Sequence, residues 1–207
     1  MSHNLTEVLR KRIIELHYRP GSPLSEKKMA EEFEVSRTPI REALIKLSQE
    51  NLVTLSPHSM ARVSDVNLQD FQELIYCRLI LERGIARLAA MNVSENEIQE
   101  LEKLGQTTFN INEDDPAAFV RHDSELHRII RKAASNSFMD RYLENAQNHF
   151  TRIQYLLSHK PTKAKMHTEL QNVLTALKNR DHEALETLMV NHVEGFVRVV
   201  RNHFRIY

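Results

Sequence analysis

The pattern of apolar positions changes period along the chain and divides it into two parts. Apolar residues recur at helical spacing over residues 4–17, 25–33 and 36–50, which predicts three helices. Residues 52–55 and 61–63 then predict two short strands around a turn at residues 57–59. Three helices followed by a small hairpin is the element order of a winged helix-turn-helix.

After Asp65 the helical period returns and continues to the end of the chain. Ser94 and Glu97 form a capping box, and Asp115 with Pro116 opens another helix. The predicted helices cover residues 68–91, 94–109, 116–134, 137–159, 162–179 and 182–204. We therefore expect a mainly α protein, with a winged helix-turn-helix domain at residues 1–66 and an all-helical bundle at residues 67–207.

Composition narrows the class of protein. The chain of 207 residues carries 28 basic and 28 acidic side chains, which argues against a general basic coat for nucleic acid but allows a local patch. No apolar stretch is long enough to span a membrane, and the start at Met1 does not resemble a signal peptide. Cys77 is the only cysteine, so no intrachain disulfide is expected and a cytoplasmic location follows. We interpret Cys77 as a small core residue of its helix.

The third helix carries a basic face. Arg37 and Arg41 are four residues apart and project from one side, whereas Ile40, Ala43 and Leu44 lie on the other. Arginine can bind guanine through two hydrogen bonds in the major groove, while Ser36, Thr38 and the helix N-terminus can hold phosphates. The alternative is a solvated helix face with two arginines, and charge alone does not decide between them.

The order of motifs in residues 5–63 favours a DNA-binding face over a solvated one. Pro20-Gly21-Ser22-Pro23-Leu24, Leu24-Ser25-Glu26, Met29-Ala30 and Val35-Ser36-Arg37-Thr38-Pro39-Ile40-Arg41-Glu42-Ala43-Leu44 resemble the DNA-binding domain of the GntR family. The resemblance implies contacts to operator DNA from Lys27, Arg37, Thr38 and Arg41. We expect further contacts from Ser36 and, in the wing, from His58 and Arg62. The sequence departs from the family at the wing tip, where Met60 replaces the usual glycine.

The helical half resembles the FadR-type ligand domain known as FCD. The motifs are Arg78-x-x-Leu81-Glu82, Leu88-Ala89-Ala90, Asp123-x-x-Leu126-His127, Ala134-Ser135-Asn136 and Leu174-x-Ala176-Leu177, followed by Asp181 and His192. Six helices in place of seven suit the VanR-like branch of that group. The resemblance implies a ligand-responsive transcription regulator, a repressor in most of the family, that acts as a homodimer.

A metal site is one reading of the helical half. Asp123 and His127 are four residues apart, so they can face one interior point, and an Asp/His set with His192 can chelate Zn²⁺ or Ni²⁺. The family's site has one aspartate and three histidines, but Leu170 stands where the middle histidine is expected. His167, about one turn earlier, is a physical hypothesis for the replacement. A pocket without metal is the alternative, and both stay open.

The effector of such a domain is expected to be a small carboxylate. The resemblance and their apolar neighbours in the sequence place Arg78 and Arg152 in the cavity, and Asn136 is expected there too. A buried guanidinium would need an anionic partner such as a carboxylate. For both arginines the alternative is a salt bridge between helices, with Glu82 as one partner. No membrane contact is expected.

The sequence also suggests two rival functions. The His122-Asp123 dipeptide suggests an HD-type metal phosphohydrolase, but adjacent helix residues diverge by about 100° and no further His and Asp complete that set. An enzyme is therefore not expected, and His122, His149 and His159 are interpreted as surface residues. The other rival is a DNA-binding dimer that has no effector.

Overall fold

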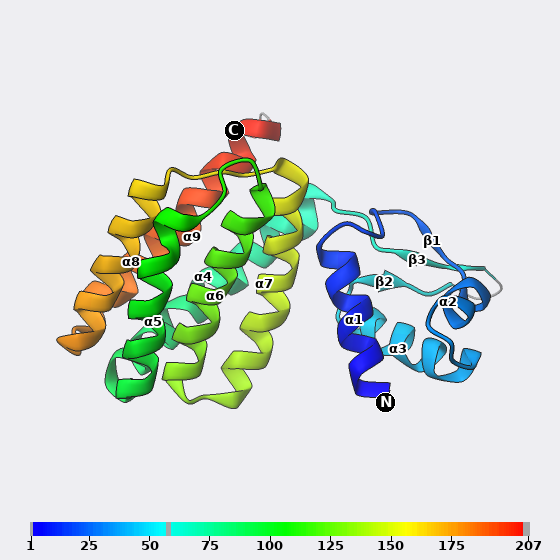
Figure 1. Ribbon diagram of the computed structural model, residues 1–207, viewed down its shortest axis with the longest axis horizontal. Coiled ribbons are helices and arrows are strands. Elements are labelled where there is room, and N and C mark those ends of the chain that lie inside the picture. Colours follow the sequence, from blue (N-terminus) through cyan, green and yellow to red (C-terminus); the bar gives the residue numbers. More distant parts are fainter. Residues whose placement is uncertain (1, 57–58, 205–207) are drawn as a thin grey trace. The chain divides into compact units, whose positions relative to one another are not determined.

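The computed structural model describes residues 2–56 and 59–204, and His58 lies outside them (Figure 1). The chain forms two compact units. The first contains residues 1–68 with residues 148–156, and the second contains residues 69–147 and 157–207.

The first unit is a winged helix-turn-helix, as predicted. Its elements are α1 (Ser2–Ile14), β1 (Pro23–Leu24), α2 (Glu26–Glu32), α3 (Arg37–Gln49), β2 (Val53–Thr54) and β3 (Ala61–Val63). The strands form one antiparallel sheet in the order β1-β3-β2, with Leu24 opposite Ala61 and Val53 opposite Val63. Strand β1 was not predicted, because two residues after Gly21 are too short to show a period.

The core of this unit fixes the orientation of α3. Leu9 of α1, Ile40 and Leu47 of α3 and Leu52 are each 0% exposed, and α3 packs against α1, α2 and β2. Asn51, two residues after the last residue of α3, has a φ of 58°, a left-handed conformation that often closes a helix. The guanidinium of Arg10 in α1 donates two hydrogen bonds, of 2.7 and 2.6 Å, to the carboxylate of Glu50. The C-terminal end of α3 is therefore held to α1.

The second unit is a helical bundle, which agrees with the predicted fold class (Figure 1). Its elements are α4 (Leu68–Asn92), α5 (Glu95–Thr107), the short 3₁₀ helix η1 (Thr108–Asn110), α6 (Pro116–Ala134), α7 (Ser137–Leu157), α8 (Lys163–Lys178) and α9 (His182–Phe204). The helices α5 and α6 begin with the N-cap residues that the sequence predicted. Glu97 accepts hydrogen bonds from the backbone N–H and hydroxyl of Ser94, and Asp115 accepts from Ala117 N–H at 3.0 Å.

The bundle core joins all six α-helices. Ile85, Leu101, Ile130, Leu177 and Met189 contribute side chains to it that are at most 1% exposed. None of the helices in the described part of the chain is long and apolar enough to cross a membrane.

The outer face of α4 differs from expectation. Cys77 is exposed, so its interpretation as a core residue was wrong. Its neighbours Tyr76 and Ile80 are 70% and 72% exposed. The core side of α4 instead carries Phe71, Ile75 and the buried charges of Arg78 and Glu82.

Candidate functional site

The first candidate site is the outer face of α3. Ile40, Ala43, Leu44 and Leu47 anchor the helix in the core, and the residues between them face outward. Arg37, Thr38 and Arg41 are all exposed at the N-terminal end of the helix. A helix N-terminus favours anions because its first N–H groups are unpaired and its dipole is positive there.

The guanidinium groups of the two arginines on this face have no described ion-pair partner. Neither Arg37 nor Arg41 forms an ion pair with any residue that the structure describes, whereas Arg10, Arg12 and Arg128 all do. A guanidinium without a protein partner remains able to bind phosphate or a base edge.

The other residues predicted to contact DNA differ in how far their side chains are already bound within the protein. Ser36 is the residue before the helix, but its side chain makes no capping hydrogen bond, contrary to the usual use of serine there. Lys27 of α2 is exposed and lies 3.9 Å from Glu31. Arg62 of β3 donates to the carbonyl of Gly21 at 2.9 Å, so it also braces the sheet. Met60, in place of the family's glycine, is 52% exposed.

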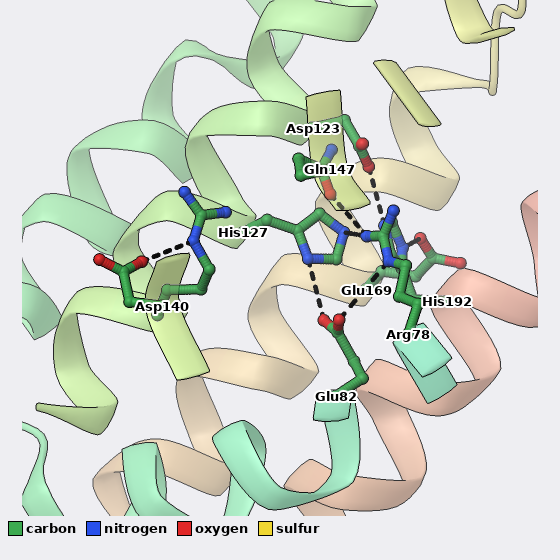
Figure 2. Close-up of polar contacts among 9 residues, drawn as sticks. Arg78, Glu82, Asp123, His127, Asp140, Gln147, Glu169 and His192 are labelled. Atoms are coloured by element: carbon green, nitrogen blue, oxygen red, sulfur yellow. Dashed lines mark hydrogen bonds and ion pairs between the residues drawn. The ribbon is translucent and has the colours of Figure 1, made fainter. Parts of the chain in front are cut away.

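The second candidate site is a cluster inside the helical unit. Asp123 and His127 of α6 and His192 of α9 each offer a ligand atom, and these atoms lie within 4.8 Å of one another. His192 Nε2 is 2.8 Å from Asp123 Oδ1, and the two histidine rings are 5.1 Å apart between centroids (Figure 2). The structure thus brings together the three residues on which the sequence-based metal hypothesis depends.

Charged partners enclose the cluster. His127 Nδ1 lies 3.0 Å from Glu82 Oε1, and its Nε2 lies 3.2 Å from Arg78 Nη2. Arg78 Nη2 also donates to Gln147 Oε1 at 2.6 Å, and Arg78 Nε is 3.6 Å from Glu82 (Figure 2). Arg78 therefore pairs with Glu82 one turn along α4, and not across two helices as the alternative expected.

Burial and charge set the protonation of these groups. Burial lowers the pKa of His127, which fits a neutral ring that donates from Nδ1 to Glu82 and accepts at Nε2 from Arg78. Burial alone would lower the pKa of His192, but Asp123 and Glu169 outweigh it and raise that pKa to about 10. Burial would likewise raise the pKa of Glu82, yet His127 and Arg78 lower it to about 2.

The cluster fits a divalent metal by its donors. One carboxylate and two imidazoles are a common ligand set for Zn²⁺ and Ni²⁺, and three protein ligands leave open positions. Ligand atoms around such an ion are about 3–3.5 Å apart, so the side chains, now up to 4.8 Å apart, would have to move together on binding. Arg78 Nη2, which is 3.2 Å from His127 Nε2, would have to leave that nitrogen. A metal there would supply positive charge and free coordination positions for a carboxylate oxygen.

Other predicted site residues lie elsewhere. His167 is outside the cluster, and its ring packs against that of Phe109, tilted by 46° with 4.8 Å between centroids. Leu170 is fully buried, with a methyl group 3.0 Å from the position that a Cβ on Gly105 would occupy. Asn136 Oδ1 accepts from Met139 N–H at 3.1 Å, which makes it a cap of α7. Arg152 is 1% exposed and donates to the carbonyl of Ser64 within the first unit.

The three histidines interpreted as surface residues are not exposed. His159 is half-buried, with its ring centroid 5.4 Å from that of Phe196. His122 is 8% exposed, and its Nε2 lies 3.0 Å from Thr108 Oγ1 and 3.2 Å from Leu104 O. His149 lies 2.9 Å from the carbonyl of Glu50 through Nε2. His122 is thus turned away from Asp123 toward α5 and η1, which removes the geometric basis of the HD-type enzyme.

The sequence did not indicate Glu169 or Gln147. Glu169 of α8 lies 3.1 Å from His192 Nδ1, although the two residues are 23 positions apart on different helices. Its only sequence signal is its place directly before Leu170, where the family has a ligand.

Two family models match successive parts of the chain. The family described as "Bacterial regulatory proteins, gntR family" matches residues 2–63, and the FCD domain matches residues 73–195. The chain is 27% identical over 203 residues to the HTH-type transcriptional repressor RspR of Escherichia coli K12, covering 97% of this chain and 89% of the relative.

Solved structures share the fold. E. coli McbR/YncC superposes with a TM-score of 0.80 at 20% identity, over 98% of each chain. A regulator from Rhodococcus sp. RHA1, described as a putative GntR, gives a TM-score of 0.79 at 20% identity, covering 100% of this chain and 98% of that one. These relatives are transcription regulators and not enzymes. The chain therefore belongs to the GntR family and is a transcription regulator with a winged helix-turn-helix domain followed by an FCD domain.

Proposed function

We propose that the protein is a ligand-responsive repressor that binds double-stranded operator DNA in the cytoplasm. The observation that carries the DNA-binding part is that Arg37 and Arg41 are both exposed on the outer face of α3 and form no described ion pair. In this proposal α3 enters the major groove with its N-terminal end. Arg37 and Arg41 read bases, while Lys27, Ser36 and Thr38 contact phosphates.

The wing has a smaller role in this proposal. The guanidinium of Arg62 already donates a hydrogen bond to the carbonyl of Gly21. A phosphate contact therefore suits Arg62 better than a base contact. Met60 stands in place of the family's wing-tip glycine, and its side chain leaves less room for the backbone to approach the minor groove.

The FCD domain is proposed to bind a small carboxylate at the cluster of Asp123, His127 and His192, held by Zn²⁺ or Ni²⁺. Among the arginines, Arg78 is supported as an effector contact because it lies against His127. Arg152 and Asn136 have less support, since their described contacts are to Ser64 and Met139. Effector binding would favour one of two conformations and so change the affinity for the operator.

The exposed apolar side chains of the helical unit support a homodimer. Tyr76 and Ile80 of α4 and Phe138 and Tyr142 of α7 are 67–72% exposed. These helices approach each other at Gly84 and Met139. Contiguous exposed apolar residues are typical of protein interfaces. Light scattering coupled to size exclusion should give a dimer for the natural chain and a monomer for Ile80→Asp with Tyr142→Asp.

The DNA-binding proposal is tested by selecting duplexes from a random library with the full-length protein. A repeated, two-fold symmetric sequence is expected, with half-sites about one or two helical turns apart, because a dimer presents two copies of α3. Enrichment of no sequence at all would contradict the proposal.

The effector part is tested with the selected duplex. The binding constant of a carboxylate that stabilises the metal-loaded protein should differ between DNA-bound and free protein, since coupling is reciprocal. A DNA-binding dimer without an effector predicts instead that no metal or carboxylate in a thermal-shift panel raises the unfolding temperature.

A further inference from the structure

Both histidines of the cluster have a carboxylate on the ring nitrogen that faces away from the centre. Glu82 Oε1 lies 3.0 Å from His127 Nδ1, and Glu169 Oε2 lies 3.1 Å from His192 Nδ1. The Nε2 atom of His192 faces Asp123 at 2.8 Å. Figure 2 shows Glu82 and Glu169 on the outer sides of the two rings.

A carboxylate that accepts from one imidazole nitrogen fixes the tautomer and orientation of the ring, and it makes the other nitrogen a better ligand. We propose that Glu169 is the positioning residue that sets His192 to bind a divalent metal through Nε2. This inference rests on the metal site proposed above. Glu82 stands in the same relation to His127, but it is buried with Arg78 and its removal would disturb the core.

The surroundings of Glu169 suit an outer position. Its side chain is 35% exposed and also lies 3.7 Å from Lys165 Nζ. The carboxylate of Glu169 is therefore partly solvated, and its charge costs little desolvation energy. Its neighbour Leu170 has no ligand atom, and His167 packs against Phe109 outside the cluster. The chain thus lacks the family's middle histidine and places a carboxylate behind His192 instead.

The experiment measures Co²⁺ affinity of the full-length, chelator-treated protein from the visible absorption of the bound ion. Glu169→Ala is expected to weaken binding by about 10- to 100-fold. Glu169→Gln should bind within several-fold of the natural chain, because its amide oxygen still accepts from Nδ1–H. The matched control is Glu186→Ala, since Glu186 lies 4.0 Å from His182 Nδ1 on α9 but outside the cluster. Its affinity should not change.

Three results would overturn the inference. Equal Co²⁺ affinity in Glu169→Ala and the natural chain would overturn it and leave the metal site standing. Equal loss in Glu169→Ala and Glu169→Gln would show that the charge, and not the hydrogen bond to His192, matters. No Co²⁺ binding by the natural chain would overturn both this inference and the proposed metal site.

Discussion

Replacing Glu82 with glutamine tests how the helical unit tolerates charges in its core. Glu82 and Arg78 are each 2% exposed and lie one helical turn apart on α4. The carboxylate is 3.6 Å from Arg78 Nε and 3.0 Å from His127 Nδ1. The variant keeps the shape of the side chain but leaves a buried guanidinium without its carboxylate.

The expected loss follows from the contacts that remain. Removing one partner of a buried ion pair costs about 3–5 kcal/mol, because the other charge stays buried without compensation. Arg78 keeps its hydrogen bond to Gln147 at 2.6 Å, and the glutamine amide can still accept from His127. We therefore expect the free energy of unfolding to fall by about 3 kcal/mol, which is the lower end of that range.

The assay is urea unfolding of the full-length protein without metal, followed by far-UV circular dichroism. Chelator is needed because a bound metal would itself stabilise the folded state. The double variant Glu82→Leu with Arg78→Met removes both charges, and it should recover more than half of the loss. The reasoning would be refuted by a loss below about 1 kcal/mol in Glu82→Gln, or by a double variant as unstable as the single one.

Three further predictions concern stability. Because the pKa of Glu82 in the fold is about 2 and its ordinary value is 4.5, its stabilisation is complete above about pH 4.5 and is lost as the pH falls toward 2. Urea midpoints between pH 5 and 3 should therefore fall more steeply for the natural chain than for Glu82→Gln. Ser94→Ala should cost about 1 kcal/mol in urea unfolding by removing the capping box of α5, with the exposed Ser137→Ala as control. Glu50→Gln weakens the two-bond contact with Arg10 and should cost about 1–2 kcal/mol, whereas the same change at Glu34, which has no described ion pair, should cost almost nothing.

The DNA-reading face was predictable because its signal is local. The alternation of Ile40, Ala43, Leu44 and Leu47 with Arg37 and Arg41 defines both sides of one helix. The same local logic found Asp123 with His127, which are four residues apart. Strand β1 was missed because it pairs with distant residues and has no period of its own.

The errors share a physical cause. On α4 apolar residues occur on both sides, so the period could not tell that Tyr76, Cys77 and Ile80 face outward. Glu169 reaches His192 only through the packing of α8 against α9, and residues on two helices have no fixed spacing in sequence. Contacts between helices thus need the structure, whereas faces of single helices do not.

The central claim, that α3 reads operator DNA through its outer face, is tested most directly by one affinity measurement. Fluorescence anisotropy with the selected duplex should show Arg41→Ala binding weaker by about 5- to 150-fold, the equivalent of about 1–3 kcal/mol for a base contact. The exposed Arg198→Ala, on α9, removes the same charge and should bind as the natural chain does. Equal affinity of Arg41→Ala and the natural chain for this duplex would contradict the claim.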